Sequence, residues 1–471
     1  MKDENKILAI IVLGIVMGAL DTTIIILALP DITKALGATL SLSIWTILVY
    51  LFIVAVATTQ LGRLGDILGR SKMFNAGFAV FTIGSALCGL APDILFLIAA
   101  RAVQAIGGSL LEANSGAIVA DTFEKSRRGR AFGFTGIGWN VGAVLGIVLG
   151  GIITTFAGWR FIFWLNVPIG IAAFIAGWHY LPKDNPAPRQ SFDLVGMLLL
   201  AASLGLLALG LVDFAGMGAN ADNAILLAAG AALLPVFFWW ESRQKQPMLD
   251  VAAFKKGVLR SSLLAAFFQA LGYLSVSFVM TLYLQGLRGL DPLDAALLLL
   301  PGYLVSAVLS PKMGSLSDRY GARVIATIGI GLMATTVLIY LSLGVDTPLY
   351  EIVIASLFAG VGASMFWPAN VSAVMAAAVQ DRHGSTSGLL RTLSNLGTLG
   401  SYVLAITAAS IAIPRQVAFG IFLGNSNLVG NLPEAFLGGL KAALFLSLIM
   451  LLIAGWLSAT RGKEERQHAI A

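Results

Sequence analysis

Long apolar runs follow one another along this chain, and they constrain its fold more than any other feature. Fourteen segments are long enough to cross a bilayer, which takes about 20 apolar residues in a helix. Since backbone polar groups within a bilayer must bond internally, these runs predict an all-α integral membrane protein. They cover residues 7–29, 42–61, 73–91, 94–119, 131–156, 160–181, 193–212, 222–240, 258–285, 294–313, 323–343, 349–378, 385–412 and 436–459.

The composition supports a membrane protein and excludes several classes of site. Of the 471 residues, 58% are hydrophobic and 11% are charged, whereas soluble proteins carry about 25% charged residues. The single cysteine, Cys88, lies within an apolar run, so no internal disulfide can form. The histidines His179, His383 and His468 share no metal-ligand spacing. We therefore expect no metal, no cofactor and no enzyme activity.

The basic residues predict the orientation of the chain in the membrane. With both termini in the cytoplasm, most of the 30 Lys and Arg residues fall in cytoplasmic loops, as the positive-inside rule requires. The net charge of +6 then reflects this loop asymmetry, and we expect no nucleic-acid partner. The predicted location is the cytoplasmic membrane. One predicted outer loop, at 413–434, is longer than the others and could be either a small hairpin or a disordered connection.

A short charged turn between two apolar runs occurs twice, at 62–72 and at 314–323. Its glycines let the flanking helix ends approach closely, and its charges can pair or bind a helix terminus. Repetition of such a turn in two halves of a hydrophobic chain is typical of a duplicated transporter. The residues expected to control movement there are Gly62, Arg63, Asp66, Gly69, Arg70, Gly314, Asp318, Arg319 and Gly321.

Both turns resemble the signature loop of the major facilitator superfamily, Gly-x-Leu-x-Asp-Arg-x-Gly-Arg. The run at 20–30, Leu-Asp-Thr-Thr-Ile-Ile-Ile-Leu-Ala-Leu-Pro, and the run at 159–170 resemble stretches of its fourteen-span drug:proton antiporter branch. The resemblance implies the major facilitator fold and proton-coupled multidrug efflux by alternating access. It also implies a monomer in the lipid bilayer whose partners are protons and lipophilic or cationic small molecules.

The distance between the two turns indicates an insertion. Asp66 and Asp318 lie 252 residues apart (318 − 66), whereas six spans with their loops take about 180–200 residues. The excess fits one helical hairpin, formed by the spans at 193–240. We therefore predict a six-helix bundle at 1–181, a linker with two inserted helices at 182–257, and a second six-helix bundle at 258–471.

Three ionisable residues within spans are candidates for proton coupling. An ionisable group inside a span costs about 2.5–3.5 kcal/mol on insertion scales, so it is a functional candidate. Asp21 and Arg101 lie at similar depth and can meet, either as a proton-exchange element or as a structural ion pair. Glu112 lies three turns after Arg101 on the same helix face. It is either a proton site or an anchor for a cationic substrate, or it bonds a neighbouring helix, for instance through Asn114 or Asn140.

Two further sets of residues complete the predicted site. A glycine at every fourth position predicts a flat face for close helix packing, at Gly138, Gly142, Gly146 and Gly150. This run resembles an antiporter motif, although Ile147 replaces its proline, which weakens the export assignment. The second half carries few carboxylates within its spans, so we expect it to shape the substrate cavity. The predicted cavity residues are Gln104, Asn114, Asn140, Gln269, Tyr273, Trp367, Asn370, Arg391 and Asn395.

Other functions remain open at this point. The chain carries no Gly-x-x-x-x-Gly-Lys-Ser/Thr motif, so transport would draw on a proton gradient or be passive. A transporter of one specific metabolite, for export or for uptake, is the main alternative. A membrane receptor on the same scaffold would need a sizeable soluble signalling domain, and a membrane enzyme would need clustered catalytic groups; neither is evident.

Overall fold

The computed structural model describes residues 2–123, 125–184, 193–244, 257–377, 383–412 and 432–462. Within these residues the regular structure is entirely helical, as predicted. The predicted outer loop at 413–434 lies outside the described residues except for the start of the last helix. The first part of the chain forms α1 (Lys2–Ala35), α2 (Leu40–Leu68), α3 (Arg70–Gly89), α4 (Ile94–Thr122), α5 (Lys125–Phe156), α6 (Arg160–Trp164) and α7 (Asn166–Tyr180).

The later helices follow the same pattern. The predicted insertion forms α8 (Leu194–Met217) and α9 (Ala221–Arg243). The last part of the chain forms α10 (Gly257–Tyr273), α11 (Val276–Thr281), η2 (Leu282–Leu287), α12 (Pro292–Tyr320), α13 (Ala322–Ser342), α14 (Leu349–Ala377), α15 (His383–Ala412) and α17 (Leu432–Ala459).

Twelve helices in the described part of the chain are long and apolar enough to cross a membrane. The two other predicted spans, 73–91 and 385–412, form the helices α3 and α15 but are not among these twelve. α3 begins with Arg70 and Lys72, and α15 is rich in Ser, Thr and Gly and contains Arg391. A total of fourteen spans therefore remains a prediction.

Two predicted spans are interrupted helices. The span predicted at 160–181 consists of α6 and α7, which meet at Leu165. The span predicted at 258–285 consists of α10, α11 and the π-helical turn η2. At the break before α11, the amide of Ser275 donates to the hydroxyl of Ser401 on α15 at 3.0 Å. A side chain of the neighbouring helix thus satisfies backbone that leaves the helical pattern.

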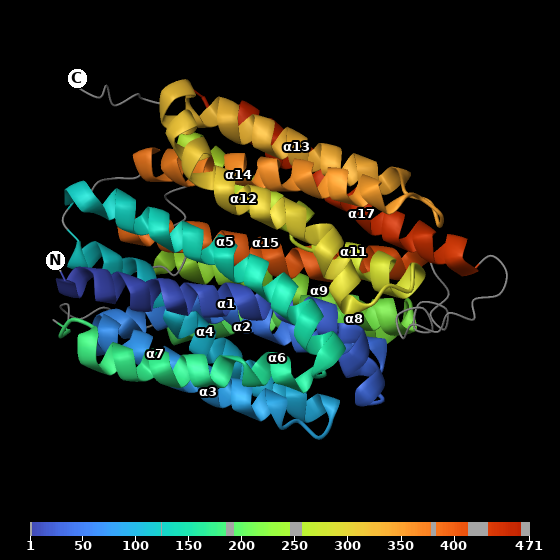
Figure 1. The fold of residues 1–471 in the computed structure, drawn as a ribbon, viewed down its shortest axis with the longest axis horizontal. Helices are drawn as coiled ribbons and strands as arrows, with labels where there is room; N and C mark the ends of the chain where they lie inside the picture. The colour runs from blue at the N-terminus through green and yellow to red at the C-terminus, as the bar shows by residue number, and fades with distance from the viewer. Residues whose placement is uncertain are drawn as a thin grey trace.

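The helices pack into two groups, which lie in the lower and upper parts of Figure 1. In the first group α4 packs on α2 and α3, and α5 packs on α1; in the second, α14 packs on α12 and α13, and α10 packs on α15 and α17. Two large cores of buried apolar side chains form, one mainly within each group, and each also includes a few residues of the other, such as Tyr402 in the first and Ile147 in the second. The two groups meet where α5 packs on α12 and α2 packs on α15. α1 begins and α17 ends at the same end of the bundle (Figure 1).

The hairpin of α8 and α9 lies against both groups. α8 packs on α9, and it also contacts α2 of the first group and α15 of the second. The hydroxyl of Ser203 on α8 donates to the carbonyl of Gly230 on α9 at 2.7 Å, which joins the two helices at a buried point. The hairpin therefore lies along the α2–α15 side of the bundle, where the two groups meet.

Candidate functional site

Asp21 and Arg101 form a buried ion pair in the first group of helices. Arg101 Nη1 lies 2.6 Å from Asp21 Oδ2, and the two side chains are 1% and 0% exposed. The predicted meeting of the two residues therefore occurs. Gln104 supports the pair: its Nε2 donates to Asp21 Oδ1 at 2.8 Å and its Oε1 accepts from Arg101 Nη1 at 2.6 Å. Because each charge is bonded, the pair can persist in an apolar interior.

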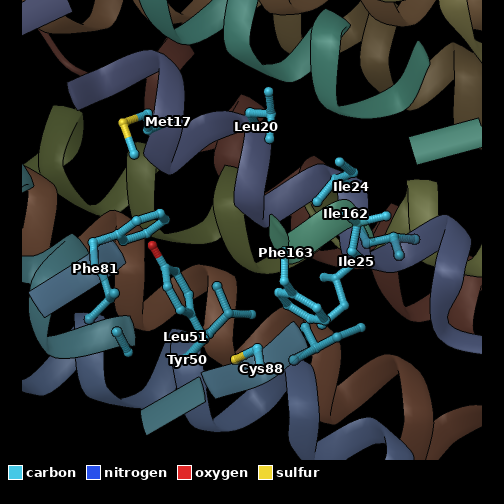
Figure 2. Packing of buried hydrophobic residues seen from close by; sticks show 14 of the residues in the cluster. Met17, Leu20, Ile24, Ile25, Tyr50, Leu51, Phe81, Cys88, Ile162 and Phe163 are labelled. Atoms are coloured by element: carbon cyan, nitrogen blue, oxygen red, sulfur yellow. The ribbon is translucent and has the colours of Figure 1, made fainter. Parts of the chain in front are cut away.

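Apolar and aromatic side chains enclose this pair. The guanidinium of Arg101 lies over the ring of Tyr50, 4.4 Å from its centroid, and 5.9 Å from that of Phe163. Figure 2 shows these rings among buried side chains that include Ile25 and Leu51. Packed side chains thus separate Asp21 from solvent in this conformation. A change in helix packing would have to open the pair before water could reach it.

A second ion pair joins the two groups of helices. Arg391 Nη1 on α15 donates to Glu112 Oε1 on α4 at 3.1 Å, and Asn395 Nδ2 lies 3.5 Å from the same oxygen. Both charged side chains are partly exposed, 19% for Glu112 and 38% for Arg391. The partners predicted for Glu112, Asn114 and Asn140, bond elsewhere. The sequence predicted all three members of this cluster as site residues but did not predict their contact.

Four predicted cavity residues are buried within their own group of helices, where packing contacts replace the expected cavity. Gln104 bonds the Asp21–Arg101 pair, and Asn114 Nδ2 donates to the carbonyl of Leu110. Asn370 Nδ2 donates to the carbonyl of Ser262, and Gln269 Nε2 lies 3.4 Å from the sulfur of Met333.

The other predicted cavity residues are less enclosed. Tyr273, Trp367, Arg391 and Asn395 are half-buried. Asn140 is also half-buried, and its Nδ2 lies 3.4 Å from the hydroxyl of Ser310 on α12, so it contacts the opposite group. Of the predicted cavity residues, Asn140, Arg391 and Asn395 therefore contact the opposite group of helices, whereas Tyr273 and Trp367 pack against the core of the second group.

The first charged turn forms a network across three helix ends. Arg70 donates to Asp66 at 2.6 Å and to Asp121 at the end of α4 at 2.6 Å. Asp184, which follows α7, accepts from the amides of Ser71 and Lys72 at 2.7 and 3.0 Å. An acidic side chain at a helix N-terminus accepts hydrogen bonds from backbone amides that lack partners within the helix, and its negative charge interacts favourably with the helix dipole. Asp121 and Asp184 were missed in the sequence, because neither lies in a repeated motif.

The glycines of this turn serve close packing and an unusual backbone conformation. Gly69 has a φ of +109°, and a Cβ there would overlap the side chain of Asp184. A Cβ on Gly65 would overlap the side-chain oxygen of Asn114 on α4. In the second turn Gly321 has a matching φ of +94° and Arg319 is exposed, while the side chain of Asp318 lies outside the described residues. The two turns are alike in backbone conformation at the helix junction.

The predicted glycine face of α5 packs against α1. A Cβ on Gly142 would lie 2.5 Å from the carbonyl oxygen of Val16, and one on Gly150 would lie 3.1 Å from that of Ile24. Thr23 adds a hydrogen bond from its hydroxyl to the carbonyl of Ala143 at 3.3 Å. The other two positions, Gly138 and Gly146, likewise face Val12 and Leu20 of α1. This packing holds the helix that carries Asp21.

These features define a multi-pass helical membrane protein with two packed groups of helices and charged groups between and within them. A family model described as Major Facilitator Superfamily matches residues 11–402. The chain belongs to this superfamily and is a membrane transporter.

Relatives of this chain include several transporters. The riboflavin transporter RibZ of Clostridioides difficile is 31% identical over 400 residues, covering 84% of this chain and 86% of that protein. A multidrug resistance protein B homolog of Mycobacterium tuberculosis is 31% identical over 328 residues, covering 69% of this chain and 60% of that protein. A bacterial homolog of the lysosomal transporter Spinster has a similar fold, with a TM-score of 0.69 and 16% identity over 98% of this chain and 97% of that one.

Proposed function

We propose that this protein is a secondary active transporter that exports lipophilic and cationic small molecules in exchange for protons. Its two groups of helices would move relative to each other and expose the site to each side of the membrane in turn. In this proposal the protein works as a monomer in the cytoplasmic membrane, and both termini are cytoplasmic, as the distribution of Lys and Arg indicates.

The observation that carries the proposal is the Glu112–Arg391 ion pair between the two groups. A carboxylate at the junction of moving bodies can bind a proton or a cation, and either event changes the attraction across the junction. Proton and cargo then compete for one group, which is the minimal requirement for exchange. Names of relatives such as the multidrug resistance protein Stp of Mycobacterium tuberculosis, 28% identical over 449 residues, fit export of foreign compounds.

The remaining residues have supporting roles in this proposal. Asp21 and Arg101 form a second proton-sensitive element, which would be exposed when α1 and α4 separate. The two charged turns, with Asp66 and Arg70 in the first, would hold one conformation and release it during the cycle. The half-buried Tyr273 and Trp367 would contact cargo in the second group of helices.

A transporter of one metabolite is the second candidate. The similarity to a riboflavin transporter favours it. So does Ile147, which stands where the export motif has proline and is buried in the core of the second group of helices. Such a protein would discriminate strongly among ligands, whereas an exporter of lipophilic compounds would accept many.

The decisive experiment is transport by purified protein in proteoliposomes with an imposed pH gradient. Internal pH and the internal concentration of a lipophilic cationic dye are followed together. We expect the dye to leave its compartment as protons enter, and Glu112→Gln to abolish this exchange. Dye movement without proton movement would contradict proton coupling. Saturable movement of riboflavin with no movement of the dye would favour the metabolite transporter.

A further inference from the structure

The two members of the Glu112–Arg391 pair are not equivalent. Glu112 is 19% exposed and its Oε1 faces two donors, Arg391 Nη1 and Asn395 Nδ2. Arg391 is 38% exposed and, among the described residues, bonds the Glu112 carboxylate through one nitrogen. Guanidinium groups carry five N–H donors, so this contact uses a small part of the capacity of Arg391.

We propose that Arg391 is a resident counter-cation that occupies the place of a cationic cargo group on Glu112. A lipophilic cation would bind by displacing the guanidinium from the carboxylate. This inference rests on the proposed function, since it concerns the cationic part of the transported compounds. It makes Arg391 a residue that sets specificity by competing with cargo, rather than one that binds it.

Of the two charged side chains in the pair, that of Glu112 is held more firmly in place by its surroundings. It lies on α4, which packs on α2 and α3, and its neighbours Asn114 and Ser115 are 1% exposed. Arg391 has a longer and more exposed side chain, which can move its charge toward water while its stem stays in place. A partly buried carboxylate without a positive partner is costly. Removal of the guanidinium therefore favours entry of another cation.

Arg101, the arginine on the same helix, does not neutralise Glu112. Arg101 on α4 is bonded to Asp21 within the core, and Tyr50 of α2 lies over Arg101 and against Gly108, one turn before Glu112. Within the described contacts, Arg391 is thus the cation that cargo must replace.

Displacement of Arg391 would also act on the contact between the helix groups. The pair joins α4 to α15, and the next residue, Thr392, forms a 2.5 Å hydrogen bond with Thr59 on α2. Cargo that replaces Arg391 keeps Glu112 neutralised but removes the electrostatic attraction between the groups. Binding of a cation and loosening of this junction would then be one event, whereas a neutral compound of the same shape would leave the pair intact.

Three probes of similar shape and different charge test this inference: tetraphenylphosphonium, neutral triphenylphosphine oxide and tetraphenylborate. Their binding to the purified full-length protein is measured by calorimetry without any gradient. For Arg391→Gln we expect about two- to fivefold tighter binding of the cation, the range of a partly exposed ion pair, and unchanged binding of the neutral probe. Arg260→Gln makes the same change at an exposed arginine of α10 and should bind all three as the wild type does.

Unchanged or weaker binding of the cation by a folded Arg391→Gln protein would overturn the inference. So would loss of tetraphenylborate binding alone, which would make Arg391 an anion site. Arg391→Lys retains a cation in the site and should bind the phosphonium nearly as the wild type does, so it provides a second variant if Arg391→Gln fails to fold. Tighter cation binding by Arg391→Gln, without proton-driven flux in proteoliposomes, would support the counter-cation and contradict the proposed proton coupling.

Discussion

Arg101 Nη1 and Asp21 Oδ2 lie 2.6 Å apart in the core of the first group of helices, and neither side chain is more than 1% exposed. Breaking a buried ion pair by removing one partner typically costs about 3–5 kcal/mol, because the other charge is left uncompensated. Asp21→Asn is therefore expected to lower the temperature of thermal unfolding in detergent. Loss of transport in Asp21→Asn could therefore result either from lower stability or from loss of the carboxylate that binds the proton.

A double variant separates these two roles of Asp21. Asp21→Asn combined with Arg101→Gln leaves no buried charge, so it should recover much of the lost stability. If proton coupling needs the carboxylate, this stable double variant will still fail to move protons. Asp31→Asn, at an exposed position of α1, is the matched control. An unfolding temperature for Asp21→Asn equal to that of the wild type would contradict the structural role.

Arg70 joins Asp66 and Asp121 at the ends of α2, α3 and α4. All three side chains are partly exposed, and such pairs contribute about 0–1 kcal/mol to stability. Asp66→Ala should therefore leave the unfolding temperature and the affinity for ligand nearly unchanged. If the turn controls movement, the same variant will slow transport several-fold, as measured by initial rates in proteoliposomes.

Asp222→Ala is the control for this variant, because Asp222 is an exposed acidic residue in the first turn of α9. It should transport at the rate of the wild type. A large loss of affinity in Asp66→Ala, with a normal transport rate, would remove the turn from the conformational cycle.

The sequence could predict the positions of residues along the membrane normal better than their positions around each bundle. Counting residues from the span ends gave Asp21 and Arg101 a common depth, and the structure brings them together. Glu112 and Arg391 lie 279 residues apart in different groups of helices. Their contact depends on how the groups pack, which hydrophobic periodicity does not encode.

The helices also differ in this way: local sequence predicted where they lie, but not the features that depend on contacts between them. The apolar runs predicted every long helix in the described part of the chain. They did not predict the break before α11, where the hydroxyl of Ser401 on another helix bonds the amide of Ser275. Likewise, burial of Gln269 and Asn370 could not be foreseen, because a polar residue in a span can face either a cavity or a neighbouring helix.

Gly146 offers a test of the packing between α5 and α1. A Cβ at this position would overlap the hydroxyl of Thr23 and lie 2.6 Å from the carbonyl oxygen of Leu20. Because Leu20 precedes Asp21, a shift of α1 would also strain the Asp21–Arg101 pair. Gly146→Ala should therefore destabilise the protein by about 1–3 kcal/mol, the usual effect of overpacking.

Thermal unfolding measures this effect, and Gly136→Ala provides a control on the same helix. A Cβ on Gly136 would meet no atom within 4 Å, so this variant should unfold at or slightly above the temperature of the wild type. Equal stability of the two alanine variants would show that α1 and α5 can separate at Gly146 without cost.

Glu112→Gln tests whether the carboxylate distinguishes cargo by charge. The variant retains the size of the side chain and can still bond Asn395, but it offers no negative charge to a proton or a cation. Efflux of a monocationic dye from proteoliposomes should fall at least tenfold, and by more than efflux of a neutral compound of similar size. Glu351→Gln, at the start of α14, makes the same substitution far from the pair in sequence and should leave both fluxes unchanged. Equal losses for the cationic and the neutral compound would instead assign Glu112 to proton transfer alone, because a group that binds only the proton drives every cargo in the same way.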